Sequence, residues 1–358
     1  MGKNKNILLL GDYSGVHHNL HKSLVKSGHN VEFISSGDGY KQIPTIKKWT
    51  DILSRDEKGR LDLNNNNEIL SGFDVVQLIN PLFADGLDAY NVLMLYRYLR
   101  ENNKKIYLYS CGDDYYWVKN SLLSLRNRTI FRNPKLFLSK EIGHPIKYIL
   151  IPSIVRLCKE IYKTVDGIIP GSIDYEWCIP ESEKKMAIIP FPVDLSYKQV
   201  SPVRKNKIYN IIHAYQPGKR YRKGDDCFQV GAVINTEKFN IKKIGGLPYL
   251  EYMNAVNDCD ILFDQAYSND QGMSALHAMS LGKITFSGFS ERFKNYYQLS
   301  DPVGVNVNGS IENVISALRG IEQGDIDVEE ISKNSIEFIK KHHDSDSVSK
   351  KFIECWFR

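Results

Sequence analysis

Short apolar runs alternate with amphipathic stretches along the whole chain of 358 residues. The runs have the length of buried strands, and the stretches between them repeat apolar residues at helical spacing. Strands that alternate with helices indicate a parallel sheet covered on both faces. The expected strands are 7–11, 31–35, 75–79, 106–112, 167–172, 186–192, 209–215, 240–246, 261–266, 284–288 and 303–307, and the clearest helices are 15–28, 87–102, 249–258, 272–282, 310–323 and 328–342.

A polar stretch, DLSYKQVSPVRKNKIYN, divides these strands into two series. It contains a proline and precedes a new strand, so we interpret it as a linker, and the strands are too many for one ordinary sheet. The sequence therefore predicts an α/β chain of two doubly wound Rossmann-like domains, 1–195 and 196–343. The last stretch, 344–358, has an apolar face of Val348, Phe352 and Trp356 and is expected to form a helix that crosses back onto the first domain.

The balance of charges and the cysteines narrow the class of protein. A net charge of +5 is too small to indicate a nucleic-acid partner by itself. The six cysteines include no CxxC pair and no zinc-binding spacing, which is typical of reduced thiols in the cytosol. The first apolar run stops at Asp12 and a turn, as a strand does and a signal peptide does not, and no run approaches the roughly 20 residues that cross a bilayer. We expect a cytoplasmic protein.

One segment of the first domain, residues 117–163, interrupts the regular pattern. It holds ten Lys and Arg residues against Glu141 and Glu160, a local balance of +8, with leucines and phenylalanines between them. Such an insertion is either a solvated helical segment with a core-facing stripe or a surface that docks on an anionic membrane, here the inner face of the cytoplasmic membrane. Binding to nucleic acid is the least favoured of the three interpretations.

Ligands of open parallel sheets bind at the carboxyl ends of the strands, and this chain has polar turns there. The first turn, GDYSGVHHNL, lacks the dinucleotide motif GxGxxG, and no P-loop occurs anywhere. Its Gly11 and Gly15 would let a ligand approach the backbone closely, whereas His17 is either a packing histidine or a site residue. After the fourth strand, Asp113 and Asp114 either cap a helix or hold sugar hydroxyls.

Two turns in the second half place cations or amide donors next to a helix start. HAYQPGKRYRKGDD puts four basic residues directly after a strand, among them Arg220 and Lys223. Fixed cations beside a helix start suit a diphosphate, and a solvated charge run is the alternative. Farther on, Gly272 begins an apolar helix whose first amides are expected to face the same cleft and an anion. His277 stands in the middle of that helix.

These turns resemble those of the retaining nucleotide-sugar glycosyltransferases with the GT-B fold, family 4 in particular. The strand followed by Arg220 and then Lys223-Gly224 fits the family's pattern, and LHAMSLGKIT matches its LEAMAxGKPV signature. PFPVD stands where the family often has PNGVD. The resemblance is strongest over 209–288. It implies two domains that face a central cleft, with the donor nucleotide on the second domain and the acceptor on the first.

The sequence departs from the family at its two characteristic glutamates, spaced E-x7-E. Asn269 and His277 replace them, with Asp270 beside the first. In the family the later glutamate holds the ribose of the donor and the former meets the hydroxyls of the sugar. The resemblance therefore assigns His277 to the ribose, since a neutral imidazole can donate or accept a hydrogen bond, and Asn269 or Asp270 to the sugar. A plain packing role for His277 is the alternative.

The resemblance implies transfer of a hexosyl or related group from a nucleotide diphosphate sugar to a glycan or lipid-linked glycan, with retention, in bacterial capsule or lipopolysaccharide synthesis. No metal and no cofactor are expected, because protein cations would stabilise the leaving nucleotide diphosphate. Two rival functions are a nucleotide-sugar epimerase of the same fold and a non-catalytic binding or scaffold subunit. The expected catalytic residues are Arg220, Lys223, Asn269 and Asp270; the expected donor-binding residues are Gly11, Gly15, Gly246, Leu247, Gly272, Met273, Ser274 and His277; and the expected acceptor-binding residues are His17, Asp113 and Asp114.

Overall fold

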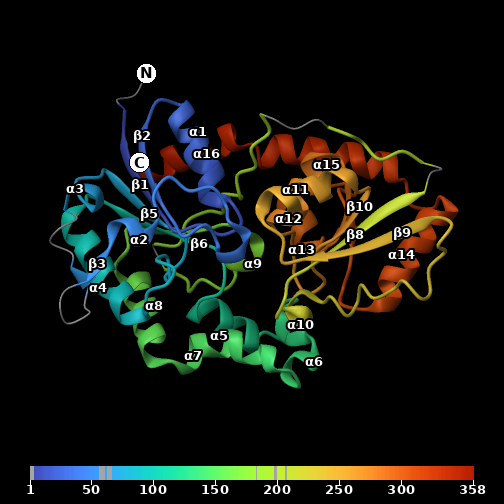
Figure 1. Ribbon diagram of the computed structural model, residues 1–358, viewed down its shortest axis with the longest axis horizontal. Coiled ribbons are helices and arrows are strands. Elements are labelled where there is room, and N and C mark those ends of the chain that lie inside the picture. The colour runs from blue at the N-terminus through green and yellow to red at the C-terminus, as the bar shows by residue number, and fades with distance from the viewer. Residues whose placement is uncertain (1–3, 56–60, 63–66, 183, 197–199, 206–207) are drawn as a thin grey trace. The chain divides into compact units, whose positions relative to one another are not determined.

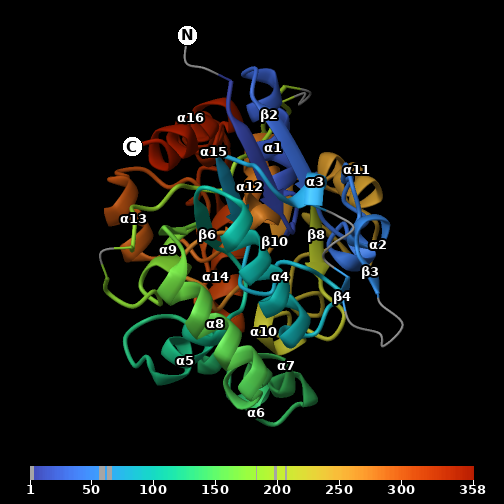
Figure 2. The ribbon, with the colours of Figure 1, turned by 90° about the vertical axis from the view of Figure 1, so that its left-hand side faces the viewer.

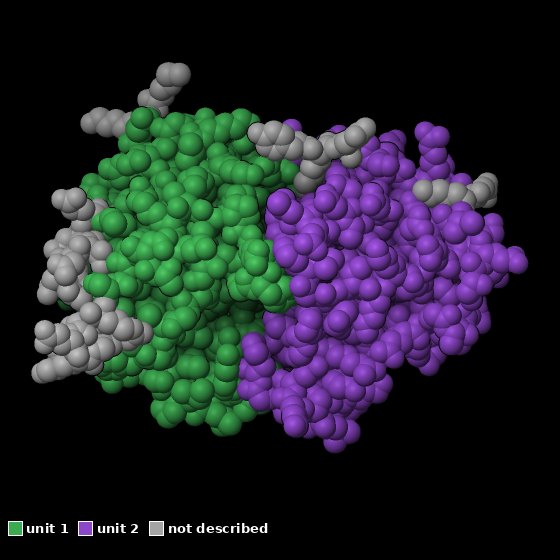
Figure 3. Space-filling model, viewed as in Figure 1, with its two compact units in different colours: residues 1–120, 145–194, 345–358 green, residues 121–144, 195–344 purple. Residues whose placement is uncertain are grey.

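A computed structural model of the chain (Figure 1) describes residues 4–55, 61–62, 67–182, 184–196, 200–205 and 208–358. The chain divides into two compact units, which Figure 3 colours separately. Unit 1 comprises residues 1–120, 145–194 and 345–358, and unit 2 comprises residues 121–144 and 195–344. Neither unit is therefore a single continuous stretch of chain.

The core of unit 1 is a five-stranded sheet with the order β2-β1-β5-β6-β7, and all its pairs are parallel. Every residue of the three strands β5, β6 and β7 is buried, as expected for a sheet that helices cover on both faces. The chain reverses its direction of winding between β1 and β5, which is where ligands bind in sheets of this kind. The strands are β1 (Asn6–Leu10), β2 (Asn30–Ile34), β5 (Val75–Leu78), β6 (Ile106–Ser110) and β7 (Gly167–Pro170).

Two helix pairs cover this sheet. Helix α1 packs on α16, and α4 packs on α8; Figures 1 and 2 both show α16 beside α1. The long helices are α1 (Val16–Lys26), α4 (Ala89–Asn102), α8 (Pro152–Thr164) and α16 (Ser345–Trp356), and shorter elements are η1 (Gly39–Lys41), α2 (Trp49–Ile52), β3 (Ser54–Arg55), β4 (Leu61–Asp62), α3 (Asn67–Leu70) and α9 (Ile173–Glu176). Helices α5 (Tyr115–Leu123) and α7 (Gly143–Leu150) carry the chain from one unit into the other.

Unit 2 has a second parallel sheet of five strands, in the order β12-β11-β10-β8-β9. Alternate residues of β8 separate its two cores, because Ile211 belongs to one apolar cluster and Ile212 to the other. The strands are β8 (Tyr209–Tyr215), β9 (Phe239–Gly245), β10 (Ile261–Phe263), β11 (Ile284–Ser287) and β12 (Val305–Asn306); the helices are η3 (Ile130–Arg132), α6 (Pro134–Phe137), η4 (Lys140–Ile142), α10 (Arg220–Lys223), α11 (Tyr249–Asp258), α12 (Met273–Ser280), α13 (Glu291–Tyr297), α14 (Ile311–Gln323) and α15 (Val328–His342).

The predicted fold class is confirmed, since both halves are doubly wound parallel α/β units. One expected strand, 186–192, was wrong: the segment runs beside β7 and bonds to it through Met186 N and Ile189 N, yet it forms no continuous ladder. Pro190 and Pro192 lack the backbone N–H that a ladder needs. The strand expected at 261–266 ends at Phe263, because Ala266 N bonds to Lys223 O instead of to a strand.

The basic segment 117–163 is not one insertion of the first domain. Its last helix, α8, is the crossover between β6 and β7 and buries Leu157 and Ile161 against the unit 1 core. Its middle part, 121–144, clusters with unit 2. The expected core-facing stripe exists, but it belongs to an ordinary element of the sheet.

The C-terminal helix α16 lies in unit 1, as expected. Val348, Phe352 and Trp356 on its apolar face are all fully buried. The helix begins next to the end of the other unit 1 segment, where Ser345 N donates to Val193 O at 3.0 Å. Within the described part of the chain, no helix has the length and apolar character that a bilayer crossing requires.

Candidate functional site

A buried carboxylate organises the carboxyl end of the unit 2 sheet. Asp264 directly follows β10 and is 3% exposed. It accepts hydrogen bonds from Lys223 Nζ (3.3 Å), from the backbone N of Gly272 (3.2 Å) and from Ser287 Oγ (3.1 Å). One side chain thus joins α10, the first residue of the α12 segment and the end of β11.

The short helix α10 carries the cations that the sequence singled out. Lys223 Nζ also donates to Gln265 Oε1 at 3.0 Å, whereas the guanidinium of Arg220 is exposed and lies 5.3 Å from the ring of Tyr221. Gly224 ends the helix with φ 78°, and a Cβ there would lie 2.7 Å from Ala266 Cβ. Only glycine fits this left-handed, closely approached position, which explains the Lys-Gly pair.

Residues 121–144 hold α10 from the side. The carboxylate of Glu141 accepts from Arg220 N (2.8 Å) and Tyr221 N (2.9 Å). Asn133, which is 1% exposed, donates to Tyr221 O at 3.0 Å, and Lys135 pairs with Asp226 at 2.9 Å. The first amides of α10, which the sequence offered to a diphosphate, are therefore already bonded to an internal anion. The side chains of α10 are what it can present to a ligand.

The start of α12 keeps amide donors for an anion. Gly272 is its N-cap residue and no side chain among the described residues caps the helix. The N–H groups of Met273 and Ser274 lie in the first turn, where a helix supplies no acceptor of its own. They carry the partial positive charge of a helix N-terminus and follow directly on the Gly272 N–H that Asp264 holds. Asp264 thus joins Lys223 to the Gly272 N–H, and the amides of Met273 and Ser274 follow next along the chain. Their contact with a donor stays a prediction.

The two residues that replace the family's glutamates are buried. Asn269 is 4% exposed; its Nδ2 donates to Arg128 O (3.0 Å), and its own carbonyl accepts from Ser290 Oγ (2.9 Å). Asp270 is equally buried, and its carbonyl accepts from Ser268 Oγ at 2.7 Å. Both residues lie in the loop between β10 and α12, where their backbone is fixed by these bonds. Their contact with a sugar stays a prediction.

His277 lies on the buried side of α12. It is 3% exposed, and its ring meets the ring of Tyr249 edge to face with centroids 6.2 Å apart. Ser280 Oγ donates to its carbonyl at 2.6 Å. The packing role that the sequence left open is therefore present, and a role toward the donor ribose stays a prediction.

Gly246 and Leu247 follow the end of β9. Gly246 has φ 69°, and Leu247 is partly buried against the apolar cluster below α11. Gly245 just before them is crowded by Tyr215, since a Cβ there would lie 2.3 Å from that ring. The ring of Tyr215 also lies 4.5 Å from Lys243 Nζ. An aromatic ring and a cation thus lie beside Gly246 and Leu247, and the contact of these two residues with the donor stays a prediction.

In unit 1, the first turn is built around Gly11 and Asp12. Gly11 has φ 76°, and a Cβ there would lie 2.5 Å from Phe83 O. Gly15 is the N-cap of α1 with φ 84°, and, its chain neighbours aside, no atom of the described residues lies within 4 Å of its Cβ position. Asp12 between them is fully buried and accepts from His17 N at 2.9 Å. Burial raises the pKa of Asp12 to about 7, and the nearby Asp38 adds to this.

His17 is a structural residue of the unit 1 core. It is fully buried, and its Nδ1 donates to Gly11 O at 2.8 Å. Nε2 therefore accepts from Gln77 Nε2 (3.1 Å), whose Oε1 accepts from Trp356 Nε1 (3.1 Å). Burial lowers the pKa of His17 to about 3, so the ring is neutral. Both ring nitrogens are used, which leaves no atom for the acceptor contact that the sequence suggested.

Asp114 caps helix α5 and Asp113 precedes it. Asp114 Oδ1 accepts from Trp117 N (2.7 Å), and Oδ2 accepts from Tyr162 OH (2.5 Å). Burial raises the pKa of Asp114 to about 6, against these two hydrogen bonds. Asp113 is partly exposed, and its carbonyl accepts from Asn80 Nδ2 at 3.3 Å. Of the two residues, Asp114 is buried and only Asp113 is partly exposed. Their contact with an acceptor stays a prediction.

The predicted donor-binding set is split by the fold. Gly11 and Gly15 lie in unit 1, and the remaining donor-binding residues lie in unit 2. The sequence marks Asp264 at the end of a strand, as it marks Asp113, but its central role among Lys223, Gly272 and Ser287 was not predicted. Sequence reasoning also missed Asn133 and Glu141, for which no local pattern exists.

Comparison with known proteins identifies the fold. No protein-family model and no curated protein matches the chain. Among solved structures, the chain is similar to sucrose-phosphate synthase from Thermosynechococcus elongatus, with a TM-score of 0.61, 11% identity and coverage of 99% of this chain and 98% of that one. It is also similar to HepE from Anabaena in complex with UDP and glucose, with a TM-score of 0.59, 10% identity and coverage of 98% and 99%. A third is the lipopolysaccharide outer core galactosyltransferase WaaB, with a TM-score of 0.54, 13% identity and coverage of 99% of both chains. The chain thus has the GT-B fold of nucleotide-sugar glycosyltransferases.

Proposed function

We propose that this protein transfers a glycosyl group from a nucleotide diphosphate sugar to a hydroxyl of a glycan or lipid-linked glycan. The observation that carries the proposal is the group around Asp264, where one buried carboxylate joins the Lys223 ammonium to the first residue of the α12 segment. A fixed cation and free helix amides at the end of a parallel sheet are what a diphosphate needs.

The chemistry follows from the charge that develops during transfer. When the bond between the anomeric carbon and the diphosphate breaks, negative charge grows on the diphosphate and the sugar becomes oxocarbenium-like. Arg220, Lys223 and the α12 amides would stabilise that charge without rearranging. Retention is the proposed stereochemical course, and it rests on the family resemblance alone.

The acceptor would bind at the carboxyl ends of β1 and β6 in unit 1, where Asp113 is a partly exposed carboxylate. His17 and Asp114 are built into the core, so we assign them a supporting role there. The description of WaaB as a lipopolysaccharide outer core galactosyltransferase supports a polysaccharide role, and HepE, solved with UDP and glucose, supports a nucleotide-sugar donor. We accordingly propose a step in bacterial surface-polysaccharide assembly, on a lipid-linked acceptor at the inner membrane face.

A non-catalytic binding subunit is the second candidate, because Asn269 and His277 stand where the family has glutamates. Both are buried and packed. A subunit of this kind would bind a nucleotide or glycan and transfer nothing. An epimerase of the same fold would convert a nucleotide sugar without any acceptor.

Calorimetric titration with UDP, GDP, ADP, TDP and CMP tests the donor site. We expect one diphosphate to bind selectively and Arg220→Ala/Lys223→Ala to weaken its binding about a hundredfold, since each hydrogen bond to a charged group contributes roughly 1.5–3 kcal/mol. Arg319→Ala/Lys333→Ala removes the same charge from exposed positions on α14 and α15 and should leave binding unchanged. Absence of binding to all five nucleotides would contradict the proposal.

Sugar transfer itself separates the candidates once the nucleotide is known. The nucleotide sugars of that base are incubated with and without a glycan acceptor, and the release of nucleotide diphosphate is followed. Acceptor-dependent release supports a transferase, conversion of the sugar without release supports an epimerase, and binding with neither supports the scaffold role.

A further inference from the structure

The elbow between α7 and α8 exposes apolar side chains at its tip. Helix α7 ends at Leu150 and α8 begins at Pro152, with Ile151 in extended conformation between them. Leu150 is 70% exposed and Ile151 is 41% exposed. Proline pre-sets the first turn of α8 and forces the residue before it out of the helix, so the sequence itself builds a projecting corner with two bare aliphatic side chains.

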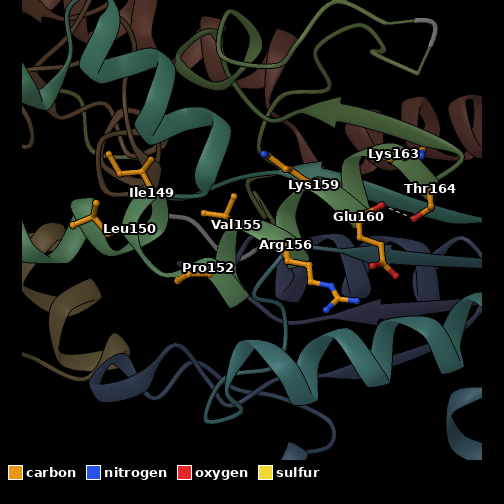
Figure 4. A pocket seen from close by; sticks show the side chains of 9 residues that line it. All are labelled: Ile149, Leu150, Pro152, Val155, Arg156, Lys159, Glu160, Lys163 and Thr164. Carbon is orange, nitrogen blue, oxygen red and sulfur yellow. Dashed lines mark hydrogen bonds between the residues drawn. The ribbon is translucent and has the colours of Figure 1, made fainter.

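A row of cations lies beside this tip on the outer face of α8. Arg156, Lys159 and Lys163 are three and four residues apart, which places them on one face of the helix, and all three are exposed. The opposite face of α8 is buried in the unit 1 core. Figure 4 shows the open pocket that Leu150 and the row line together, with Leu150 at one end and Lys163 at the other.

The row keeps its positive charge because its one carboxylate is already paired. Glu160 accepts two hydrogen bonds from Arg97 of α4, at 2.6 and 2.8 Å. This pairing lowers the pKa of Glu160, with a smaller contribution from Arg156. Lys159 Nζ lies 5.4 Å from the centroid of the Tyr115 ring, in a cation–π contact. Arg97 thus compensates the charge of Glu160, and Arg156, Lys159 and Lys163 make the row basic.

We propose that the α7–α8 elbow docks unit 1 on an anionic lipid surface. Leu150 and Ile151 would enter the interface between headgroups and acyl chains, and Arg156, Lys159 and Lys163 would contact lipid phosphates. A nucleic acid would use the cations but not two bare aliphatic side chains, whereas a charged bilayer uses both. The long Lys and Arg stems can lie along the apolar tip while their heads reach the phosphates.

This inference needs no catalytic activity, but it deepens the proposed function by naming a surface on which a lipid-linked acceptor is presented. It also replaces the whole segment 117–163 by one corner of unit 1 as the membrane contact. The other exposed leucines of that segment, around Leu125, belong to unit 2 and are not part of the proposed surface.

Vesicle flotation with the full-length protein tests the proposal. We expect binding to phosphatidylcholine vesicles that contain phosphatidylglycerol, little binding to phosphatidylcholine alone, and loss of binding at high salt. Each basic residue near an anionic leaflet raises the affinity for the membrane roughly fivefold. The variant Arg156→Gln/Lys159→Gln/Lys163→Gln should therefore bind the vesicles about a hundredfold more weakly. Leu150→Ser/Ile151→Ser should also bind more weakly although its charge is unchanged.

Matched controls come from surfaces elsewhere in the chain. Leu250 is also 70% exposed, so Leu250→Ser removes an equally bare leucine. Lys341→Gln/Lys350→Gln/Lys351→Gln removes the same charge from exposed positions. Both controls should float like the wild type. Equal flotation of the α8 triple variant and the wild type, or no flotation of the wild type, would overturn the proposal, as would loss of binding in the charge control.

Nucleotide binding distinguishes a failure of this proposal from a failure of the proposed function. The elbow variants should keep the wild-type affinity for the selected diphosphate, because their substitutions lie in unit 1 outside the Asp264 group. Nucleotide binding without flotation would leave the transferase proposal standing and end the docking proposal. A short RNA retained by the wild type and lost by the α8 triple, with no vesicle binding, would reassign the surface to nucleic acid.

Discussion

Asp12 is a carboxyl group that the fold holds in an unfavourable place. Burial raises its pKa from 3.8 to about 7, so between about pH 4 and pH 7 the folded state binds a proton that the unfolded state has released. The unfolding free energy therefore rises as the pH falls below 7 and Asp12 takes up a proton in the folded state. Above pH 7 the buried carboxylate is ionised, and the unfolding free energy is lowest. The unfolding free energy of Asp12→Asn minus that of the wild type should therefore be larger at pH 8 than at pH 4, by at most about 4 kcal/mol. Urea unfolding of both proteins at the two pH values measures this, and a difference that does not grow with pH would refute it.

His17 has the opposite pH dependence. Burial lowers its pKa from 6.5 to about 3, so the unfolded state takes up a proton first as the pH falls. His17 does not reduce the unfolding free energy above about pH 6.5. Between pH 6.5 and pH 3 the unfolded state is protonated at this residue and the folded state is not, so the unfolding free energy falls. His17→Gln keeps a donor for Gly11 O and removes the titration, so its unfolding free energy should fall less than that of the wild type between pH 7 and pH 4. Parallel loss in both proteins would show that His17 is not responsible.

Some parts of the candidate site could be predicted from the sequence, and the role of His17 could not. The turn containing Gly11 and the Lys223-Gly224 pair were recognisable, because glycine at a strand end signals a close or left-handed backbone. Whether His17 faces a ligand or the core was not, since that depends on Gln77 and Trp356 far along the chain. Burial of a single polar residue follows from its tertiary neighbours and leaves no local pattern.

At the level of elements, the segment 121–144 is what fixes α10. An isolated four-residue helix has little stability of its own, and here the two carboxylate oxygens of Glu141 satisfy its first amides. Glu141→Ala should leave these amides unpaired, loosen α10 and weaken nucleotide diphosphate binding about tenfold, as loss of a charge-assisted hydrogen bond implies. Glu141→Gln keeps one acceptor and should fall between the two.

Lys140→Ala is the matched control for this prediction, because Lys140 is exposed on the same short η4 turn. It should bind the nucleotide like the wild type. Calorimetry on the three variants measures the effect, and the thermal stability of each shows whether the loss is local. Wild-type affinity in Glu141→Ala would mean that α10 holds its shape without the segment.

Elements were predictable where an apolar period runs their whole length. Helices α11 and α15 begin and end at the expected residues, because each buries one stripe on a sheet. The strand expected at 303–307 is reduced to Val305–Asn306, and 186–192 is interrupted by prolines. The place of residues 121–144 in unit 2 was beyond prediction, since it depends on single polar contacts such as Arg128 to Asn306 (2.8 Å).

At the scale of the whole molecule, the chain passes between its two units several times, and each unit depends on a segment that is distant in sequence. Unit 2 receives residues 121–144, and unit 1 receives α16. The linear order of two domains and a linker, which composition suggested, is therefore only approximate. Cutting the chain at its linker would remove part of the core of unit 1.

The clearest whole-molecule prediction concerns that cut. A fragment of residues 1–194 lacks the fully buried Val348, Phe352 and Trp356, whose burial is worth roughly 6 kcal/mol in sum, comparable to the 5–15 kcal/mol that stabilises an ordinary domain. It should show no cooperative thermal unfolding by circular dichroism.

Joining residues 345–358 to residue 194 through a short glycine linker should restore a cooperative transition, because Ser345 N lies 3.0 Å from Val193 O. Residues 121–144 are present in both fragments. A Trp356→Ala/Phe352→Ala version of the joined fragment is the control, and it should behave like 1–194. If 1–194 alone unfolds cooperatively at the same temperature as the joined fragment, α16 is an accessory of unit 1 and not part of its core.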